Sequence, residues 1–384
     1  MKKQMFYFLC IGFLILSSCS PVSPTLPTLA PSEAAQPALT LLPKAQTTAT
    51  QPVAVQKEDI KIETLTVLTH DSFSASKEGI AAFEKQNNVK ISFIKGGDAG
   101  AALNRAILTK NSPIADVFYG VDNTLLSRAE ENGIFEVYES PKLSEISDEF
   151  KLSKDHFLSP VDFGDVCINY EKAYFSEKNL EVPQSLEALS KPEYKGLLVV
   201  ENPTTSSTGL AFMLATIKDF GVENYIDFWR SLRKNDVLVV NDWETAYYTH
   251  FSGSSGRGPR PMVVSYGTSP AAEVIFADPK PKEAPTASLV GTNMCFRQVE
   301  FAGILKGTTK RALAEKFIDF LLDTEFQNDI PMQMFVYPVN KNAVVPAEFK
   351  AFAQAPETPA QLDPLDIAAN RETWINTWEE AVIR

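Results

Sequence analysis

Acidic side chains stand in short polar segments that follow apolar, β-branched stretches of this 384-residue chain. Asp71, Asp98 and Asp122 each occupy such a segment. Two or three carboxylates brought together at the ends of strands could hold a cation. Each aspartate could equally cap the helix that follows it, because the positive end of the helix dipole favours a carboxylate. The residues alone leave both interpretations open.

Five consecutive hydroxyl residues, 204–208, precede another predicted helix and include Ser206 and Ser207. Free backbone N–H groups at a helix start can receive an anion or a hydroxyl group. The alternative is an ordinary N-cap without any ligand. A single cap needs one hydroxyl residue, so the length of the run favours a binding role.

Aromatic residues at 243–248 suggest two kinds of ligand. Trp243 lies between Asp242 and Glu244, and an aromatic face beside carboxylates suits an organic cation. A tryptophan is also a common core residue. Tyr247 and Tyr248 are adjacent, and paired phenolates could bind ferric iron, although neighbouring residues of a helix diverge by about 100° and one of them can be core.

A catalytic site needs a nucleophile beside a base. Ser72 is close in sequence to His70 and Asp71, but consecutive residues at a strand end alternate faces and rarely form a triad. The chain has no GxSxG and no HExxH motif. Catalysis therefore has little support, and we expect no enzymatic activity.

The amino-acid composition excludes several other classes of protein. The chain has 36 Lys and Arg against 48 Asp and Glu, and a formal charge of −12 argues against a nucleic-acid binder. Four cysteines without a CxxC motif exclude a disulfide-rich scaffold, and three scattered histidines do not predict a metal site. We expect no cofactor and no bound metal. Cys167 and Cys295 could pair or stay free.

The N-terminal segment predicts export. Residues 1–18 contain Lys2 and Lys3 followed by an apolar run that is short for a membrane span, as in a signal peptide. The run ends in LSSC, which resembles a lipobox and predicts lipidation of Cys19; an ordinary secretory signal is the alternative. Residues 19–58 are rich in Pro, Thr and Ala and predict a disordered linker. We therefore expect a lipid-anchored protein in the periplasm or on the outer face of the cell membrane.

Strands and helices alternate through the rest of the chain. Predicted strands are 63–69, 89–94, 115–119, 166–170, 197–201, 237–240 and 261–266. Predicted helices are 75–86, 125–132, 209–220, 225–234 and 309–323, and another follows Asp98. Two such blocks predict an α/β fold with two lobes and a cleft between them. Ligands of such folds bind beyond the carboxyl ends of the strands, where the polar segments described above lie.

Eight motifs, in order along the chain, carry a resemblance to a known family. They are LTVLTHDSF (65–73), ALNR (102–105), ADVFYGVDNTLL (115–126), NPTTSSTGL (202–210), DWETAY (242–247), VVSYGTSPA (263–271), FQNDIPMQMFVYPV (326–339) and RETWINTWEEAV (371–382). Together they resemble the thiamine-binding solute receptors of bacterial ABC importers. The resemblance extends from about residue 62 to the C-terminus.

This resemblance implies a two-lobed periplasmic-binding-protein fold of type II, with hinge strands between the lobes. It implies a first lobe of residues 59–162 and 268–336, a second lobe of residues 163–267, and a C-terminal helical segment, 337–384, packed on the second lobe. It also implies capture of thiamine or a thiamine phosphate by a monomer and its delivery to a permease with an ATPase subunit. The implied ligand-binding residues, together with the acids and the histidine discussed above, are Asp98, Ala99, Ser206, Ser207, Trp243, Tyr266, Gly267, Thr268, Ser269, Phe335, His70, Asp71 and Asp122.

The chain departs from the family pattern at three positions. His70 replaces an aromatic residue, Phe335 replaces a tryptophan, and Ala272 replaces a tyrosine. A smaller ring surface could change the ligand while the receptor class is kept. The alternatives are therefore the same fold with ferric iron, a polyamine or another small ion, and, with less support, an exported enzyme.

Overall fold

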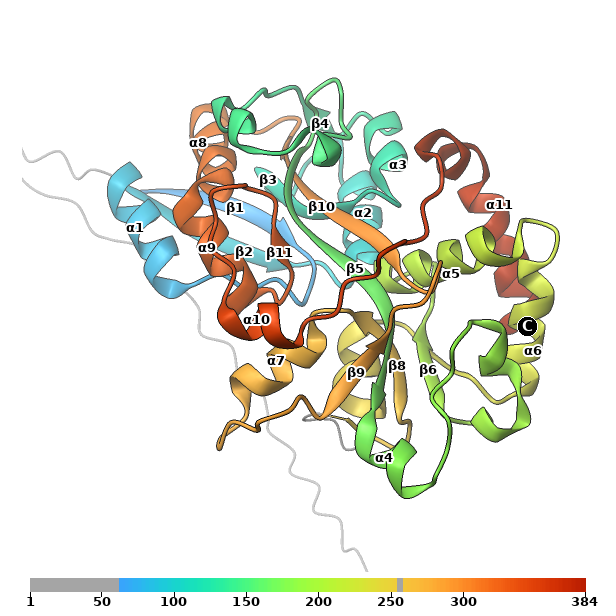
Figure 1. The fold of residues 1–384 in the computed structure, drawn as a ribbon. Helices are drawn as coiled ribbons and strands as arrows, with labels where there is room; N and C mark the ends of the chain where they lie inside the picture. The colour runs from blue at the N-terminus through green and yellow to red at the C-terminus, as the bar shows by residue number, and fades with distance from the viewer. Residues whose placement is uncertain (1–61, 254–257) are drawn as a thin grey trace, which may run out of the picture. The chain divides into compact units, whose positions relative to one another are not determined.

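The central strand of the sheet, β5 (Ser159–Glu171), holds two groups of strands together (Figure 1). The computed structural model describes residues 62–253 and 258–384, all within one unit, Ile60–Arg384. The predicted signal peptide (1–18), the lipidation site Cys19 and the linker (19–58) lie outside the described residues. The strands follow the order β2-β1-β3-β10-β5-β8-β6-β7, and β4, β9 and β11 pair beside this path.

The first group of strands, called here the first half, lies beside the N-terminal part of β5. Strand β1 (Glu63–Thr69) is parallel to β2 (Val89–Lys95) and to β3 (Val117–Asp122). Strand β10 (Phe296–Leu305) is antiparallel to both β3 and β5, and it also pairs with the short β4 (Phe135–Glu136). Every residue of β3 is buried, as expected for an interior strand between β1 and β10 whose sheet is covered on both faces.

The second group, the second half, lies beside the C-terminal part of β5. Strand β8 (Met262–Tyr266) pairs with one edge of β5, and β9 (Thr286–Leu289) pairs with the other. Strand β6 (Leu198–Glu201) continues the sheet parallel to β8 and to β7 (Leu238–Val240). Strand β5 therefore belongs to both halves, because different residues of one strand pair with each.

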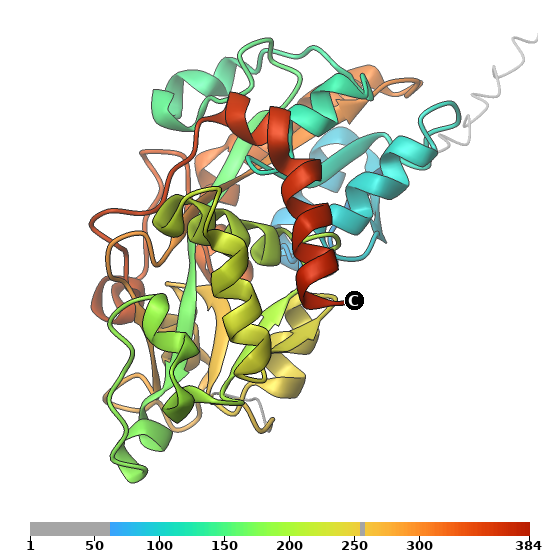
Figure 2. The same ribbon diagram turned by 90° about the vertical axis from the view of Figure 1, so that its right-hand side faces the viewer.

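Eleven α-helices of the described residues surround these strands (Figures 1 and 2). They are α1 (Lys77–Asn87), α2 (Ala99–Leu108), α3 (Leu126–Glu131), α4 (Lys172–Glu177), α5 (Ser207–Phe220), α6 (Tyr225–Lys234), α7 (Ser269–Phe276), α8 (Arg311–Leu322), α9 (Thr324–Gln333), α10 (Ala347–Phe352) and α11 (Pro364–Val382). A single π-helical turn spans Thr245–His250. No helix among the described residues is long and apolar enough to cross a bilayer.

The strands predicted from apolar periodicity are all present, with boundaries shifted by a few residues. The largest shift is in β5, which begins seven residues before the predicted start at 166. Strands β4, β9, β10 and β11 (Tyr337–Pro338) were not predicted. In β10 the polar residues Arg297, Gln298 and Glu300 interrupt the apolar pattern, and periodicity alone does not identify such a strand.

The C-terminal helix α11 packs on α6 and reaches α3 (Figure 2). Trp378 meets Trp229 edge to face, with ring centroids 5.4 Å apart, and the Tyr225 hydroxyl donates to the carbonyl of Trp374 at 3.1 Å. The buried Arg371 donates to the carbonyl of Thr124 at 3.2 Å, just before α3. Helix α11 thus contacts elements beside both halves of the sheet.

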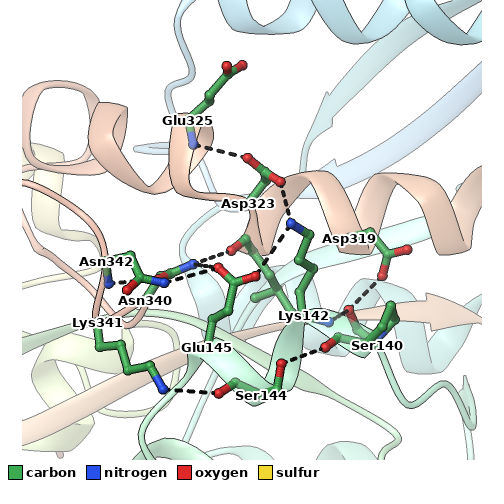
Figure 3. Close-up of polar contacts among 12 residues, drawn as sticks. Ser140, Lys142, Ser144, Glu145, Asp319, Asp323, Glu325, Asn340, Lys341 and Asn342 are labelled. Atoms are coloured by element: carbon green, nitrogen blue, oxygen red, sulfur yellow. Dashed lines mark hydrogen bonds and ion pairs between the residues drawn. The ribbon is translucent and has the colours of Figure 1, made fainter.

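Polar contacts fix the segment that follows β11 (Figure 3). The amide of Asn340 donates to Glu145 at 3.0 Å and to the carbonyl of Leu322 at 2.9 Å. Lys142 forms an ion pair of 2.7 Å with Asp323, at the junction of α8 and α9. These contacts hold in place the chain that leads from α9 through β11, and this stretch carries Phe335.

The predicted lobe boundaries remain a prediction, but one pairing suggests a different second crossing. Strand β9 pairs with Ile168–Glu171 of β5, whereas β10 pairs with the part of β5 up to Val166. We therefore propose that the chain passes from the second lobe to the first between Leu289 and Phe296, not near residue 267. By the same pairing, we propose that the first crossing lies within β5 itself.

A disulfide joins these two crossing segments. Cys167 of β5 and Cys295, just before β10, are bonded, and both are fully buried. The bond closes a loop with a sequence separation of 128 residues. The sequence left open whether these two cysteines pair or stay free. In the structure they pair, at the junction of the two halves.

We expect simultaneous replacement of Cys167 and Cys295 by serine to lower the free energy of unfolding by about 2–5 kcal/mol, because the bond restricts the unfolded chain. Urea denaturation followed by tryptophan fluorescence measures this change. A thiol reductant during unfolding should lower the midpoint of the natural chain and leave that of the double variant unchanged. Equal midpoints for the two oxidised proteins would contradict the assignment.

Candidate functional site

A cavity of about 600 Å³ lies between the two halves of the sheet, near the carboxyl ends of several strands. Eight of the predicted site residues line it: His70, Asp98, Ala99, Ser207, Trp243, Tyr266, Ser269 and Phe335. Residues that were not assigned to a binding site also line it, among them Glu244, Glu273, Phe276 and Glu300. Tyr247 and Tyr248, which were considered only as ligands of ferric iron, line it as well. The structure therefore brings together most of the predicted residues from segments far apart in sequence.

Five predicted residues do not line this cavity: Asp71, Asp122, Ser206, Gly267 and Thr268. The carboxylate of Asp71 accepts from the Gly97 amide at 3.0 Å. Gly267 exchanges backbone hydrogen bonds with Asp165 and Gln354 at 2.8 and 2.7 Å, and the Thr268 hydroxyl donates to the carbonyl of Phe335. Asp122 and Ser206 are fully buried behind the wall. These five residues lie next to the cavity lining and are not part of it.

The second half supplies an aromatic wall. The rings of Trp243 and Tyr247 are stacked, with centroids 5.0 Å apart and an interplanar angle of 19°. Tyr248 meets Trp243 edge to face at 5.5 Å. The indole N–H donates to the Ser265 hydroxyl at 2.9 Å, which fixes the orientation of the ring. Both tyrosines of the π-helical turn line the cavity, with ring centroids 5.5 Å apart and ring planes nearly perpendicular.

The first half supplies acidic groups, beginning with Asp98 at the start of α2. One carboxylate oxygen accepts from the Ala99 amide at 2.6 Å, as an N-cap does, and the other accepts from the Trp243 amide at 3.1 Å. Burial raises the pKa of Asp98, and hydrogen bonds from Ser206 and Trp243 oppose that rise. Asp98 therefore caps α2 and also lines the cavity, and its role in holding a cation stays a prediction. The bond to Trp243 also joins the two halves directly.

Glu300 and His70 meet on the same side of the cavity. His70 Nε2 lies 3.3 Å from Glu300 Oε1. Burial raises the pKa of Glu300 to about 8 and lowers the pKa of His70. At neutral pH the two groups therefore meet as an imidazole and a carboxylic acid and not as an ion pair.

A chain of hydrogen bonds leads from Tyr266 into the protein. The Tyr266 hydroxyl donates to Gln298 Oε1 at 2.7 Å, and Gln298 Nε2 donates to Asp122 Oδ2 at 3.1 Å. Asp122 also accepts from the amide and the hydroxyl of Thr124 at 2.6 and 2.5 Å. A Cβ at Gly164 would lie 2.7 Å from the Tyr266 ring, so only glycine leaves space for that ring. The chain fixes Tyr266 at the cavity wall.

The charge of the cavity excludes most anions. Among the described lining residues there are five carboxyl side chains and neither lysine nor arginine. Burying an anion against carboxylates is unfavourable, whereas a cation with flat rings gains from both the acids and the aromatic faces. No group of three or more His, Cys, Asp or Glu among the described residues is arranged to hold a metal ion. The arrangement therefore suits a small organic cation.

Comparisons with known proteins agree with this arrangement. Residues 112–355 match the family described as "Bacterial extracellular solute-binding protein". The chain belongs to this family. The thiamine-binding periplasmic protein of Escherichia coli K12 is 31% identical over 83% of this chain and 94% of its own length, and that of Brucella suis is 30% identical over 84% and 93%. The solved structure titled "Periplasmic thiamin binding protein" superposes with a TM-score of 0.75 at 29% identity, covering 84% of this chain and 97% of that one.

Membership of the solute-binding family confirms the predicted fold class, a two-lobed type II periplasmic-binding-protein fold. It also confirms the class of function, that of an extracytoplasmic solute receptor. This is a family of receptors and not a family of enzymes. The resemblance read from eight sequence motifs is confirmed by the same relatives.

Sequence reasoning missed the acids that lie within strands. Asp162 of β5 and Glu300 of β10 are directly opposite each other in the pairing of these strands, and both are buried. Each has apolar residues next to it in sequence, in PVDF and VEFA. A charged residue inside an apolar strand was the available signal, because such residues are seldom buried without a partner.

We expect the stability of the ligand-free receptor to fall as pH rises from about 4.5 to 8. The folded state keeps the Glu300 proton in this range while the unfolded state releases it, so the slope is negative and reaches about 1.4 kcal/mol per pH unit. The Glu300→Gln variant should have a shallower slope in urea denaturation at pH 5.5, 7 and 8.5. Glu244→Gln, which changes an exposed carboxylate of the same cavity, is the control, and equal slopes for all three proteins would disprove the assignment.

Proposed function

We propose that this receptor captures thiamine in the cavity between its lobes and delivers it to an ABC permease and its ATPase subunit. The observation that carries the proposal is the composition of the described lining: stacked Trp243 and Tyr247 face buried carboxyls, with no lysine or arginine among them. Thiamine is a permanent organic cation with two flat rings, which suits both sides. The similarity to thiamine-binding periplasmic proteins supports the same ligand.

The proposed contacts divide between the two halves. Trp243, Tyr247 and Tyr266 supply ring faces from the second half, and Phe335 adds a ring from the first. Asp98 supplies negative charge, while a cation over an indole face gains about 0.5–2 kcal/mol. Because Trp243 and Tyr247 lie on the second half while Asp98 and Glu300 lie on the first, the ligand gains all of these contacts only when the lobes are closed.

The start of α5 is the place where the ligand's side chain would make hydrogen bonds. Ser207 and Thr208 line the cavity there, and they could receive a hydroxyl group or a phosphate ester. The surrounding carboxyls favour the uncharged hydroxyl group. We therefore propose thiamine as the preferred ligand and its monophosphate as a weaker one.

The receptor role requires no chemistry on the ligand, and we propose that the protein is a monomer that releases thiamine unchanged. We also propose that Cys19 carries lipid after cleavage of residues 1–18. The linker of residues 19–58 would then let the receptor reach its permease from the periplasmic or outer face of the membrane. Hydrolysis of ATP belongs to the partner subunit.

Isothermal titration calorimetry of the unfolded and refolded receptor tests the ligand. We expect one-to-one binding of thiamine, with weaker binding of thiamine monophosphate and weaker still of the pyrophosphate. Trp243→Ala should weaken thiamine binding tenfold or more, since about 1.4 kcal/mol of stacking corresponds to one decade. Trp243→Phe is the matched control, because it keeps a ring and loses only the hydrogen bond to Ser265, and it should bind with intermediate affinity.

If the natural protein and Trp243→Ala bound thiamine with equal affinity, Trp243 would not contribute to the binding site. Absence of heat with all three compounds, from a correctly folded sample, would disprove thiamine as the ligand and leave the receptor fold intact. A visible charge-transfer colour on addition of ferric iron would instead favour the Tyr247 and Tyr248 alternative.

We expect the Cys19→Ser variant to be released from the membrane fraction, because one cysteine carries the whole lipid anchor. Fractionation of expressing cells, followed by immunodetection, measures the distribution of the protein. The natural protein should stay with membranes in high salt and dissolve only in detergent. Release of the natural protein by salt would show that residues 1–18 act as an ordinary secretory signal.

A further inference from the structure

Two carboxyl groups are directly opposite each other behind the cavity. Asp162 of β5 and Glu300 of β10 are partners in the antiparallel pairing, so their side chains share one face of the sheet. Asp162 is 1% exposed and Glu300 is 8% exposed. The two carboxyl groups are hydrogen-bonded to each other. A hydrogen bond between two carboxyl groups requires that one of them carries a proton.

The groups that face this pair supply no fixed positive charge. Beyond β1, His70 lies 3.3 Å from Glu300 and is neutral for the reason given above. From β3, the Tyr119 hydroxyl donates to Asp162. The other titratable groups that act on the pair are acids or phenols: Asp98 at the start of α2, Asp122 of β3 and Tyr266 of β8.

The lysine that acts on His70, Lys95, makes its hydrogen bonds outside the cavity. Lys95 at the end of β2 donates to the carbonyl of Asp71 at 2.7 Å and to that of Phe73. It does not line the cavity, and neither does any other lysine or arginine of the described residues. Two like charges in contact without a counter-charge cannot both be present in a buried site. Below about pH 8 the empty receptor therefore keeps one proton on the pair.

The ligand can reach one member of the pair. Glu300 lines the cavity, whereas Asp162 lies behind it and Tyr119 closes the pair from the protein interior. A cation in the cavity would supply the positive charge that the pair lacks. Full ionisation of the pair then becomes favourable, because each carboxylate gains an opposite charge nearby.

We propose that Asp162 and Glu300 act as a proton-sharing pair that detects the charge of the ligand: entry of a permanent cation expels the shared proton to solvent. In this step the O–H bond of the protonated carboxyl breaks and water accepts the proton, and no other bond changes. The site charge falls by one as the ligand charge of plus one enters, so the cavity gains no net charge. This inference rests on the proposed cationic ligand, thiamine.

The pair makes the receptor selective for charge as well as shape. A permanent cation compensates two carboxylates, whereas a neutral molecule of the same outline leaves the proton in place and gains no ionic contact. Affinity for the cation should increase about tenfold per pH unit between pH 6 and 7.5 and level off above about pH 8. Acidification would then favour release of the ligand.

Calorimetric titration of the exported protein with thiamine, in two buffers of different ionisation enthalpy at pH 7, counts the released protons. We expect close to one proton for the natural receptor and close to zero for Glu300→Gln, which binds thiamine more weakly. Asp162→Asn should behave like Glu300→Gln, which keeps the test valid if one variant fails to fold. Glu244→Gln is the control, since it removes an exposed carboxyl group of the cavity that lies outside the pair, and it should still release one proton.

Infrared spectroscopy tests the pair without any ligand. The natural receptor at pH 7 should show the C=O band of a protonated carboxylic acid that Glu300→Gln lacks, and thiamine should remove this band. Binding of thiamine with the same heat in both buffers would overturn the inference while the proposed function stands. Absence of thiamine binding would overturn the proposed function. If the natural receptor and Glu300→Gln also had the same infrared spectrum, the claim that Asp162 and Glu300 share a proton would be overturned as well.

Discussion

The double pairing of β5 is the constraint on which the rest of the structure depends. The strand is antiparallel to β10 through its first part and to β8 and β9 through its second part, so the two halves share one backbone. Asp162 in the first part is one of the buried acids, and Cys167 at the change of partners forms the disulfide. Because both crossing segments are joined there, movement of one half relative to the other must turn about this covalent junction and cannot separate the strands.

The cavity stores unfavourable electrostatic free energy that a ligand can relieve. Asp98, Asp122, Asp162 and Glu300 lie close together, and burial raises the pKa of each carboxyl group. Hydrogen bonds from Thr124, Gln298 and Tyr119 satisfy part of this charge without neutralising it. An enzyme would use such raised pKa values for proton transfer to a substrate, whereas a receptor can use them to make an empty cavity less stable than a cavity that holds a cation.

Local sequence signals predicted the elements of the fold better than they predicted the interior of the site. Alternating apolar residues identified β1, β2 and β3, and a hydroxyl run identified the start of α5, because these signals are local. Asp162 and Glu300 were missed because their roles come from strand pairing across more than 130 residues, which no local pattern records. The acids Asp71 and Asp122 were assigned to the lining because residues that follow strands usually face the ligand. Neither lines the cavity: Asp71 accepts from the Gly97 amide, and Asp122 is the last residue of β3 and accepts from Thr124.

One of the positions at which this chain departs from its family pattern, His70, lies beside the buried acids of the cavity. His70 stands where a ring is expected, and it keeps a flat ring against Tyr119 while adding a nitrogen beside Glu300. A phenol at this position could donate to Glu300 but could not become a cation, whereas an imidazole could take up a proton if the pair ionised. Burial opposes that charge, so His70 stays neutral in the empty receptor and leaves the positive charge to be supplied by the ligand. His70 thus replaces an aromatic contact of the family pattern with a ring that lies 3.3 Å from Glu300 and does not neutralise it.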